Sequence, residues 1–111
     1  MSKQTETGMT DAERRAEEQQ VFRQVTEDLI VAGSAEDRNS DFYTALDRNR
    51  SLWSALRKDV MSRANRLPRE LCEQIDQLGE WVEVQTARVV RGEGRINTLI
   101  VVNRNLIDGL T

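Results

Sequence analysis

The chain has no histidine, one cysteine, one proline and few aromatic residues, and these shortages remove whole classes of function. Without histidine, and with Cys72 as the only thiol, the usual zinc and haem sites are excluded, as are histidine-based triads and general bases. No apolar run approaches the roughly 18 residues that a membrane-spanning helix needs, and residues 1–8 lack the apolar core of a signal peptide. We therefore expect a cytoplasmic protein that uses no metal or cofactor.

What is present is a chain of 111 residues, enough for one domain with one modest core. Its charge is uneven along the sequence. Residues 1–47 hold five basic and eleven acidic side chains (net −6), residues 48–69 hold seven and one (net +6), and residues 70–111 hold four and seven (net −3). Either these blocks neutralise each other in the fold, or the basic block offers a surface to an acidic partner, protein or RNA.

Apolar residues recur with helical spacing in four segments separated by polar or glycine-containing stretches. The sequence therefore predicts an all-α protein, a compact bundle of about four helices in a single domain over residues 10–111. The polar segment 1–9 is expected to be disordered. The four predicted helices span roughly residues 11–32, 41–64, 68–90 and 96–108.

Local signals mark several helix ends. Thr10 and Glu13 form a capping box at the start of the first helix. Gly33 is suited to a left-handed cap at its end. Pro68 suits the first turn of the third helix, where its missing N–H costs nothing, and Gly92 ends that helix. The glycine-containing segment 91–95 is interpreted as a turn rather than a phosphate-binding loop, since no strand precedes it.

Two asparagines occupy core-type positions in otherwise apolar stripes, Asn49 in the second predicted helix and Asn103 in the fourth. A buried amide costs roughly 1–3 kcal/mol unless it finds hydrogen-bond partners. Either the two amides satisfy each other and fix the register of the helices, or they face a partner. Arg50 and Arg104, which follow them, must close internal ion pairs or point at a partner.

Trp53 lies on the apolar stripe of the second helix, and Trp81 stands beside the stripe of the third. The first position favours the core, whereas the second favours half exposure. Since tryptophan often anchors protein interfaces, the pair also suits a binding surface. Gly79, mid-helix, suggests close approach of a neighbouring helix. The candidate partner-binding residues are thus Asn49, Arg50, Trp53, Trp81, Asn103 and Arg104.

Several paired residues resemble, in order and spacing, the FlaF-type flagellar biosynthesis regulators of alphaproteobacteria. The resemblance is strongest over residues 40–111. Among the matching elements are Asn49-Arg50, Leu52-Trp53, Leu67-Pro68, Trp81-Val82, Val102-Asn103-Arg104 and Gly109-Leu110.

This resemblance implies a non-enzymatic cytoplasmic factor that promotes flagellin synthesis or export, alongside an FlbT-type regulator that binds flagellin messenger RNA. Our hypothesis is that the helical domain binds flagellin as a chaperone, with Trp53, Trp81, Arg50 and Arg104 lining a groove for an amphipathic helix. The alternative is a post-transcriptional regulator that contacts the messenger RNA, directly through the basic block of residues 48–69 or through the FlbT-type partner. The oligomeric state is left open.

Overall fold

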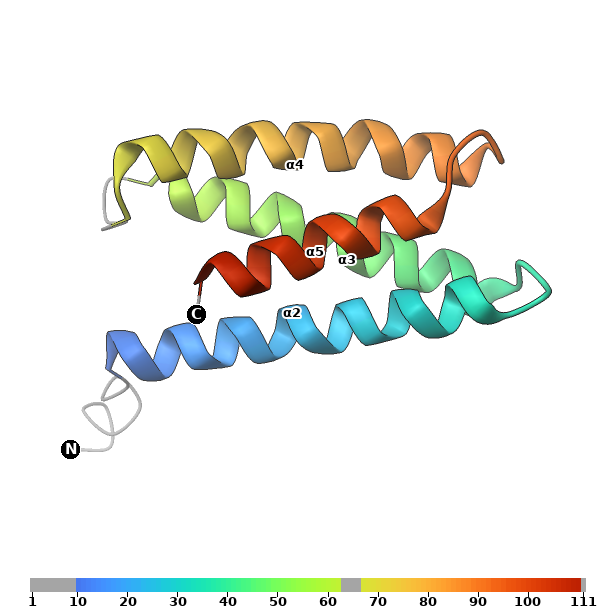
Figure 1. Ribbon diagram of the computed structural model, residues 1–111, viewed down its shortest axis with the longest axis horizontal. Helices are drawn as coiled ribbons and strands as arrows, with labels where there is room; N and C mark the ends of the chain where they lie inside the picture. Colours follow the sequence, from blue (N-terminus) through green and yellow to red (C-terminus); the bar gives the residue numbers. More distant parts are fainter. Residues whose placement is uncertain (1–9, 63–66, 111) are drawn as a thin grey trace.

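The computed structural model describes residues 10–62 and 67–110, and this part of the chain forms helices and no strand. The helices run alternately up and down along a molecule about 50 Å long (Figure 1). The predicted all-α bundle is therefore confirmed, while the expected disorder of residues 1–9 lies outside the described residues. The helices are α2 (Asp11–Ser34), α3 (Ser40–Val60), α4 (Arg69–Val90) and α5 (Ile96–Leu110).

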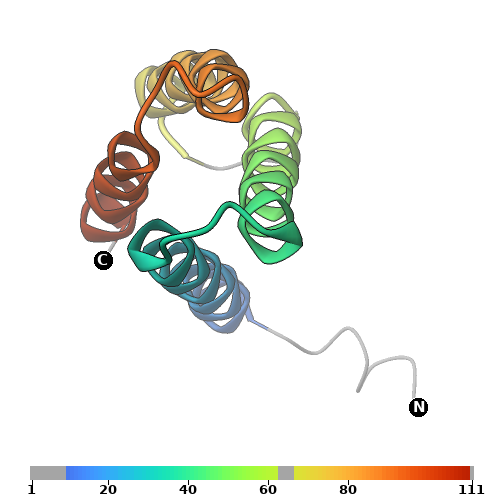
Figure 2. The same ribbon diagram turned by 90° about the vertical axis from the view of Figure 1, so that its right-hand side faces the viewer.

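Seen end-on, the four helices form a ring in which each packs against its sequence neighbours and α2 closes the circle against α5 (Figure 2). The contact between α4 and α5 is the least extensive of the four. The apolar stripe of each helix points into the ring, as the helical spacing predicts. At the centre, the rings of Phe22 and Trp53 meet edge to face with centroids 5.7 Å apart. The same core contains fully buried aliphatic side chains, among them Leu29, Leu46, Ile75, Val82 and Leu99.

Two of the predicted helix ends are confirmed in detail. The Thr10 hydroxyl accepts from the Glu13 amide, and the Glu13 carboxylate accepts from the Thr10 amide, each at 3.1 Å. At the end of α4, Gly92 has a φ of +79°, and its amide donates to the carbonyl of Val89. The guanidinium of Arg38, in the α2–α3 connection, donates to the same carbonyl at 2.7 Å. A cation there suits the negative end of the α4 dipole.

Three of the approximate boundaries differ in detail in the structure. Gly33 does not end α2 in a left-handed conformation; it is helical, and a Cβ there would lie 2.9 Å from Ile96 Cγ2 of α5, so the glycine permits close packing. The second helix ends at Val60 rather than near residue 64, because the chain tightens into i→i+3 bonding at Ser62. Pro68 lies one position before the first residue of α4, as its N-cap, and its carbonyl accepts from the Cys72 amide at 3.0 Å.

Candidate partner-binding groove

On one side, α4 lies tightly against α3. Gly79 is buried there because the aliphatic stem of Arg57 lies over it, so that a Cβ would overlap Cδ of that side chain. The close approach predicted at Gly79 is therefore confirmed. Arg57 Nε then donates to Asp76 Oδ1 at 3.0 Å, and Arg50 Nη1 donates to Glu83 Oε1 at 3.3 Å. These contacts close the α3–α4 side.

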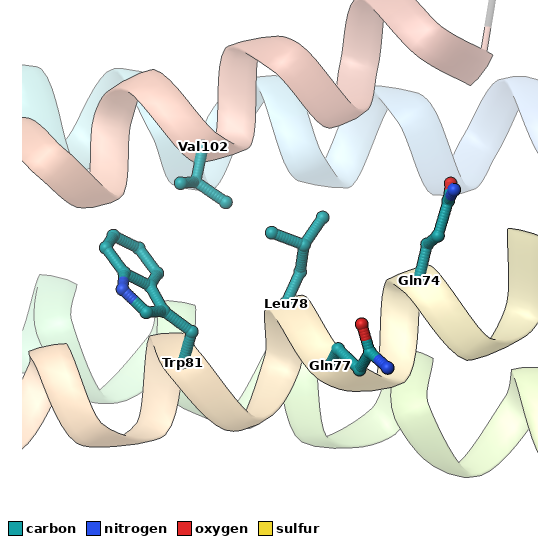
Figure 3. A pocket seen from close by; sticks show the side chains of 5 residues that line it. All are labelled: Gln74, Gln77, Leu78, Trp81 and Val102. Carbon is teal, nitrogen blue, oxygen red and sulfur yellow. The ribbon is translucent and has the colours of Figure 1, made fainter.

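On its other side, α4 packs less extensively against α5, and an open groove of about 470 Å³ lies between the two helices. Leu78 and Trp81 rise from α4 toward Val102 on α5, while Gln74 and Gln77 line the groove along α4 (Figure 3). Leu78 and Trp81 remain 38% and 36% exposed. The groove thus combines three apolar side chains with two uncharged amides and contains no ionisable group among its lining residues.

Three of the predicted site residues, Asn49, Trp53 and Asn103, meet in the core instead, each at most 1% exposed. Trp53 Nε1 donates to Asn103 Oδ1 at 2.9 Å. Asn103 Nδ2 donates to Asn49 Oδ1 at 2.7 Å and to the Thr26 hydroxyl at 3.0 Å. The Thr26 hydroxyl in turn donates to the carbonyl of Phe22 at 2.6 Å. A single amide on α5 therefore ties α2 and α3 together.

Asn103 and Asn49 differ in how well the core satisfies them. Asn103 uses both of its amide protons and its carbonyl oxygen. Asn49 accepts one bond, but its Nδ2 has no hydrogen-bond partner within the described part of the chain. The interpretation in which the two asparagines pair inside the bundle is therefore confirmed, with one amide group left unsatisfied.

A comparison with protein families now decides the identity of this fold. The sequence model of flagellar protein FlaF matches residues 3–110, nearly the whole chain. The chain belongs to the FlaF family. No curated protein and no solved structure gives a significant match. FlaF is a family of flagellar proteins and not an enzyme family.

In this FlaF-family fold the two arginines of the predicted site lie away from the groove. Arg50 binds Asp47 and Glu83 on the outer face of α3 and α4, and these hydrogen bonds, that to Asp47 foremost, raise the pKa of its guanidinium. Arg104 is exposed and follows the groove residue Val102 by two positions, about 200° around a helix. It makes no ion pair with any described residue.

The structure therefore does not bring the six predicted residues together, and Trp81 is the member of that set that lines the groove. Sequence reasoning did not select Gln74, Gln77, Leu78 or Val102 as lining residues. The available signal was the i, i+3 spacing of Leu78 and Trp81, which places both side chains on neighbouring parts of one helix surface.

Other kinds of site find little support in the described parts of this FlaF-family chain. Residues 10–62 and 67–110 contain no cluster of three or more acidic or cysteine side chains arranged to hold a metal ion. No helix in those ranges combines the length and apolarity needed to cross a bilayer. The basic block of residues 48–69 is partly neutralised by α4, through the ion pairs of Arg50 and Arg57.

Proposed function

We propose that this FlaF-family chain promotes flagellin synthesis or export in the cytoplasm by binding newly made flagellin as a chaperone, without catalysing a reaction. The observation that carries the proposal is the α4–α5 groove, in which Leu78, Trp81 and Val102 stay accessible beside a well-packed core. An accessible apolar groove between two helices suits a third, amphipathic helix.

The terminal segments of flagellin are amphipathic helices that aggregate when the monomer is free. An amphipathic helix that lies along α4 would pack its own apolar face against the indole of Trp81. Tryptophan is a residue type that often dominates the binding energy of an interface. The uncharged amides of Gln74 and Gln77 at the edge can hydrogen-bond to polar groups of such a helix without selecting for charge. These features support a groove that recognises the apolar face and the helical shape of its partner.

The experiment measures binding of purified flagellin monomer to the wild-type chain and to Trp81→Ala by isothermal titration. Truncating a central indole typically weakens binding by about tenfold or more, so we expect a loss of that size. Tyr43→Ala is the matched control, because Tyr43 is a similarly exposed aromatic residue (41%) on α3 that does not line the groove. Unchanged affinity in a folded Trp81→Ala variant contradicts the proposal.

A direct RNA contact is the competing proposal, and the charge pattern gives it less support. Two of the seven basic residues in positions 48–69, Arg50 and Arg57, are engaged by carboxylates of α4. RNA binding through this block would weaken steeply as salt rises, because phosphate contacts release counterions. Binding to flagellin messenger RNA by the chain alone, with such a slope, would favour this alternative; binding that appears with an FlbT-type partner present would assign the RNA contact to that partner.

A further inference from the structure

The helix α4 carries a second heptad stripe on its outer surface, beside the stripe that it buries. The spacing of this outer stripe is 4-3-4-3-4, the spacing at which side chains of one helix face a partner helix over several turns. All six residues are exposed. We call them the outer stripe: Glu70, Gln74, Gln77, Trp81, Val84 and Arg88.

The outer stripe is complementary to the outer stripe of a second copy when the two helices run in opposite directions. Its middle is uncharged, its first residue is acidic and its last is basic. If two copies of α4 lie antiparallel about a two-fold axis near residue 79, position 70 faces 88, position 74 faces 84 and position 77 faces 81. Glu70 then meets Arg88 twice, once at each end.

We propose that a second copy of this chain docks on the outer stripe, α4 against α4, in an antiparallel two-fold dimer. Within residues 10–62 and 67–110, neither Glu70 nor Arg88 forms an ion pair, so both are available to the second copy. Trp81 of the second copy lies opposite Gln77, next to Gln74 and Leu78, which line the groove. The indole of each copy thus enters the groove edge of the other, and the contact is isologous.

The dimer is weak, because one helix face of 22 residues, about 33 Å long, carries few apolar side chains. It also covers Trp81. If the groove binds flagellin as proposed above, the second copy and flagellin compete for it. This competition, unlike the dimer itself, rests on the proposed function. Self-association then shields the apolar groove while no flagellin is available.

A different explanation exists for the two charges, since an acidic residue in the first turn and a basic residue in the last both favour the α4 dipole. The two explanations predict opposite results for a double reversal. Exchanging both charges makes both helix ends unfavourable, yet it restores the attraction between antiparallel copies.

The test is sedimentation equilibrium of the full chain over micromolar to millimolar concentrations, for wild type, Glu70→Arg, Arg88→Glu and the double variant. Each single reversal replaces two attractions with two repulsions, so we expect the dimer dissociation constant to rise roughly tenfold or more. The double variant should return to within about threefold of wild type. Glu17→Arg and Arg23→Glu, exposed charges on α2, are the matched controls and should leave dimerisation unchanged.

A wild-type chain that stays monomeric throughout this range overturns the dimer, and so does a double variant that dimerises no better than the singles. Neither result affects the proposed function, because Glu70 and Arg88 do not line the groove. Conversely, flagellin that fails to bind leaves the dimer in place. Where the dimer and flagellin binding are both observed, the single-reversal variants should bind flagellin at least as tightly as wild type, because a weaker dimer competes less for the groove.

Discussion

The two tryptophans of this chain occupy opposite kinds of surroundings. Trp53 is 1% exposed and donates its indole N–H to Asn103, whereas Trp81 is 36% exposed and makes no hydrogen bond with the described residues. Both lie on helices with a strong apolar stripe. The difference lies in their position relative to that stripe and in the presence of a buried acceptor, because an indole N–H taken out of water needs a partner.

The contrast extends to the regions around them. Around Trp53, polar groups are fully enclosed and joined in one network with Asn103 and Thr26. Around Trp81, apolar groups remain open between α4 and α5. Substitutions in the first region should therefore change the free energy of unfolding, and substitutions in the second should change binding.

The largest expected effect is that of Trp53→Ala. It removes the indole that packs against Phe22 and leaves Asn103 Oδ1 without its donor. Large-to-small changes of this kind cost about 3–5 kcal/mol. Urea denaturation followed by circular dichroism measures the loss, with Trp81→Ala as the counterpart, expected below about 1 kcal/mol. Similar losses for both variants would abolish the distinction between the two tryptophans.

The next largest effect separates the two asparagines inside the core. Asn103→Leu leaves Trp53 Nε1 and Asn49 Oδ1 buried without partners, which should cost about 2–4 kcal/mol. Asn49→Leu removes an Nδ2 group that has no partner and leaves one donor, an amide proton of Asn103, without its acceptor, so its cost should be smaller by about 1 kcal/mol. The same denaturation measurement compares them. An Asn49→Leu variant that is the less stable of the two would show that its Nδ2 is satisfied in solution.

Much of this core could be predicted from the sequence, because it depends on periodicity. The apolar stripe that contains Asn49 and Trp53 defines which side of α3 is buried, and the pairing of Asn49 with Asn103 was one of two alternatives that the sequence left open. Thr26 could not be predicted as the third member. It meets Asn103 across 77 positions, and that contact depends on how α2 and α5 pack.

The groove was harder to predict for a related reason. Whether a flank residue such as Val102 is covered depends on how closely α5 approaches α4, and no local pattern encodes that separation. Gly33 illustrates the same difficulty. A glycine at the end of the helical pattern predicted a left-handed cap, whereas in the structure the missing side chain lets Ile96 of α5 approach closely. Local rules fix helix ends well only where no distant element competes, as at Gly92.

A smaller effect tests the exposure of each indole directly. Trp53→Phe leaves Trp81 as the sole tryptophan, and Trp81→Phe leaves Trp53. Because water relaxes around an excited indole, the Trp81 signal should lie at longer wavelength and be quenched several-fold more strongly by acrylamide. Adding flagellin should shift the Trp81 signal to shorter wavelength and leave that of Trp53 in place. Equal quenching of both single-tryptophan variants would contradict the structure.

The smallest expected effect concerns Glu13, which lies outside the surroundings of both tryptophans and serves as a control for them. The pKa of Glu13 is lowered by its hydrogen bonds with the backbone and side chain of Thr10, in the first turn of α2. The stabilisation is therefore complete above the ordinary pKa of glutamate and is lost as pH falls through the lowered value. NMR titration of Glu13 should show this low pKa, and Thr10→Ala should raise it toward the ordinary value. Phe22, which contacts Trp53, lies nine residues after Glu13, so the fluorescence of neither tryptophan should change with this titration. A change would show that the capping box is coupled to the core.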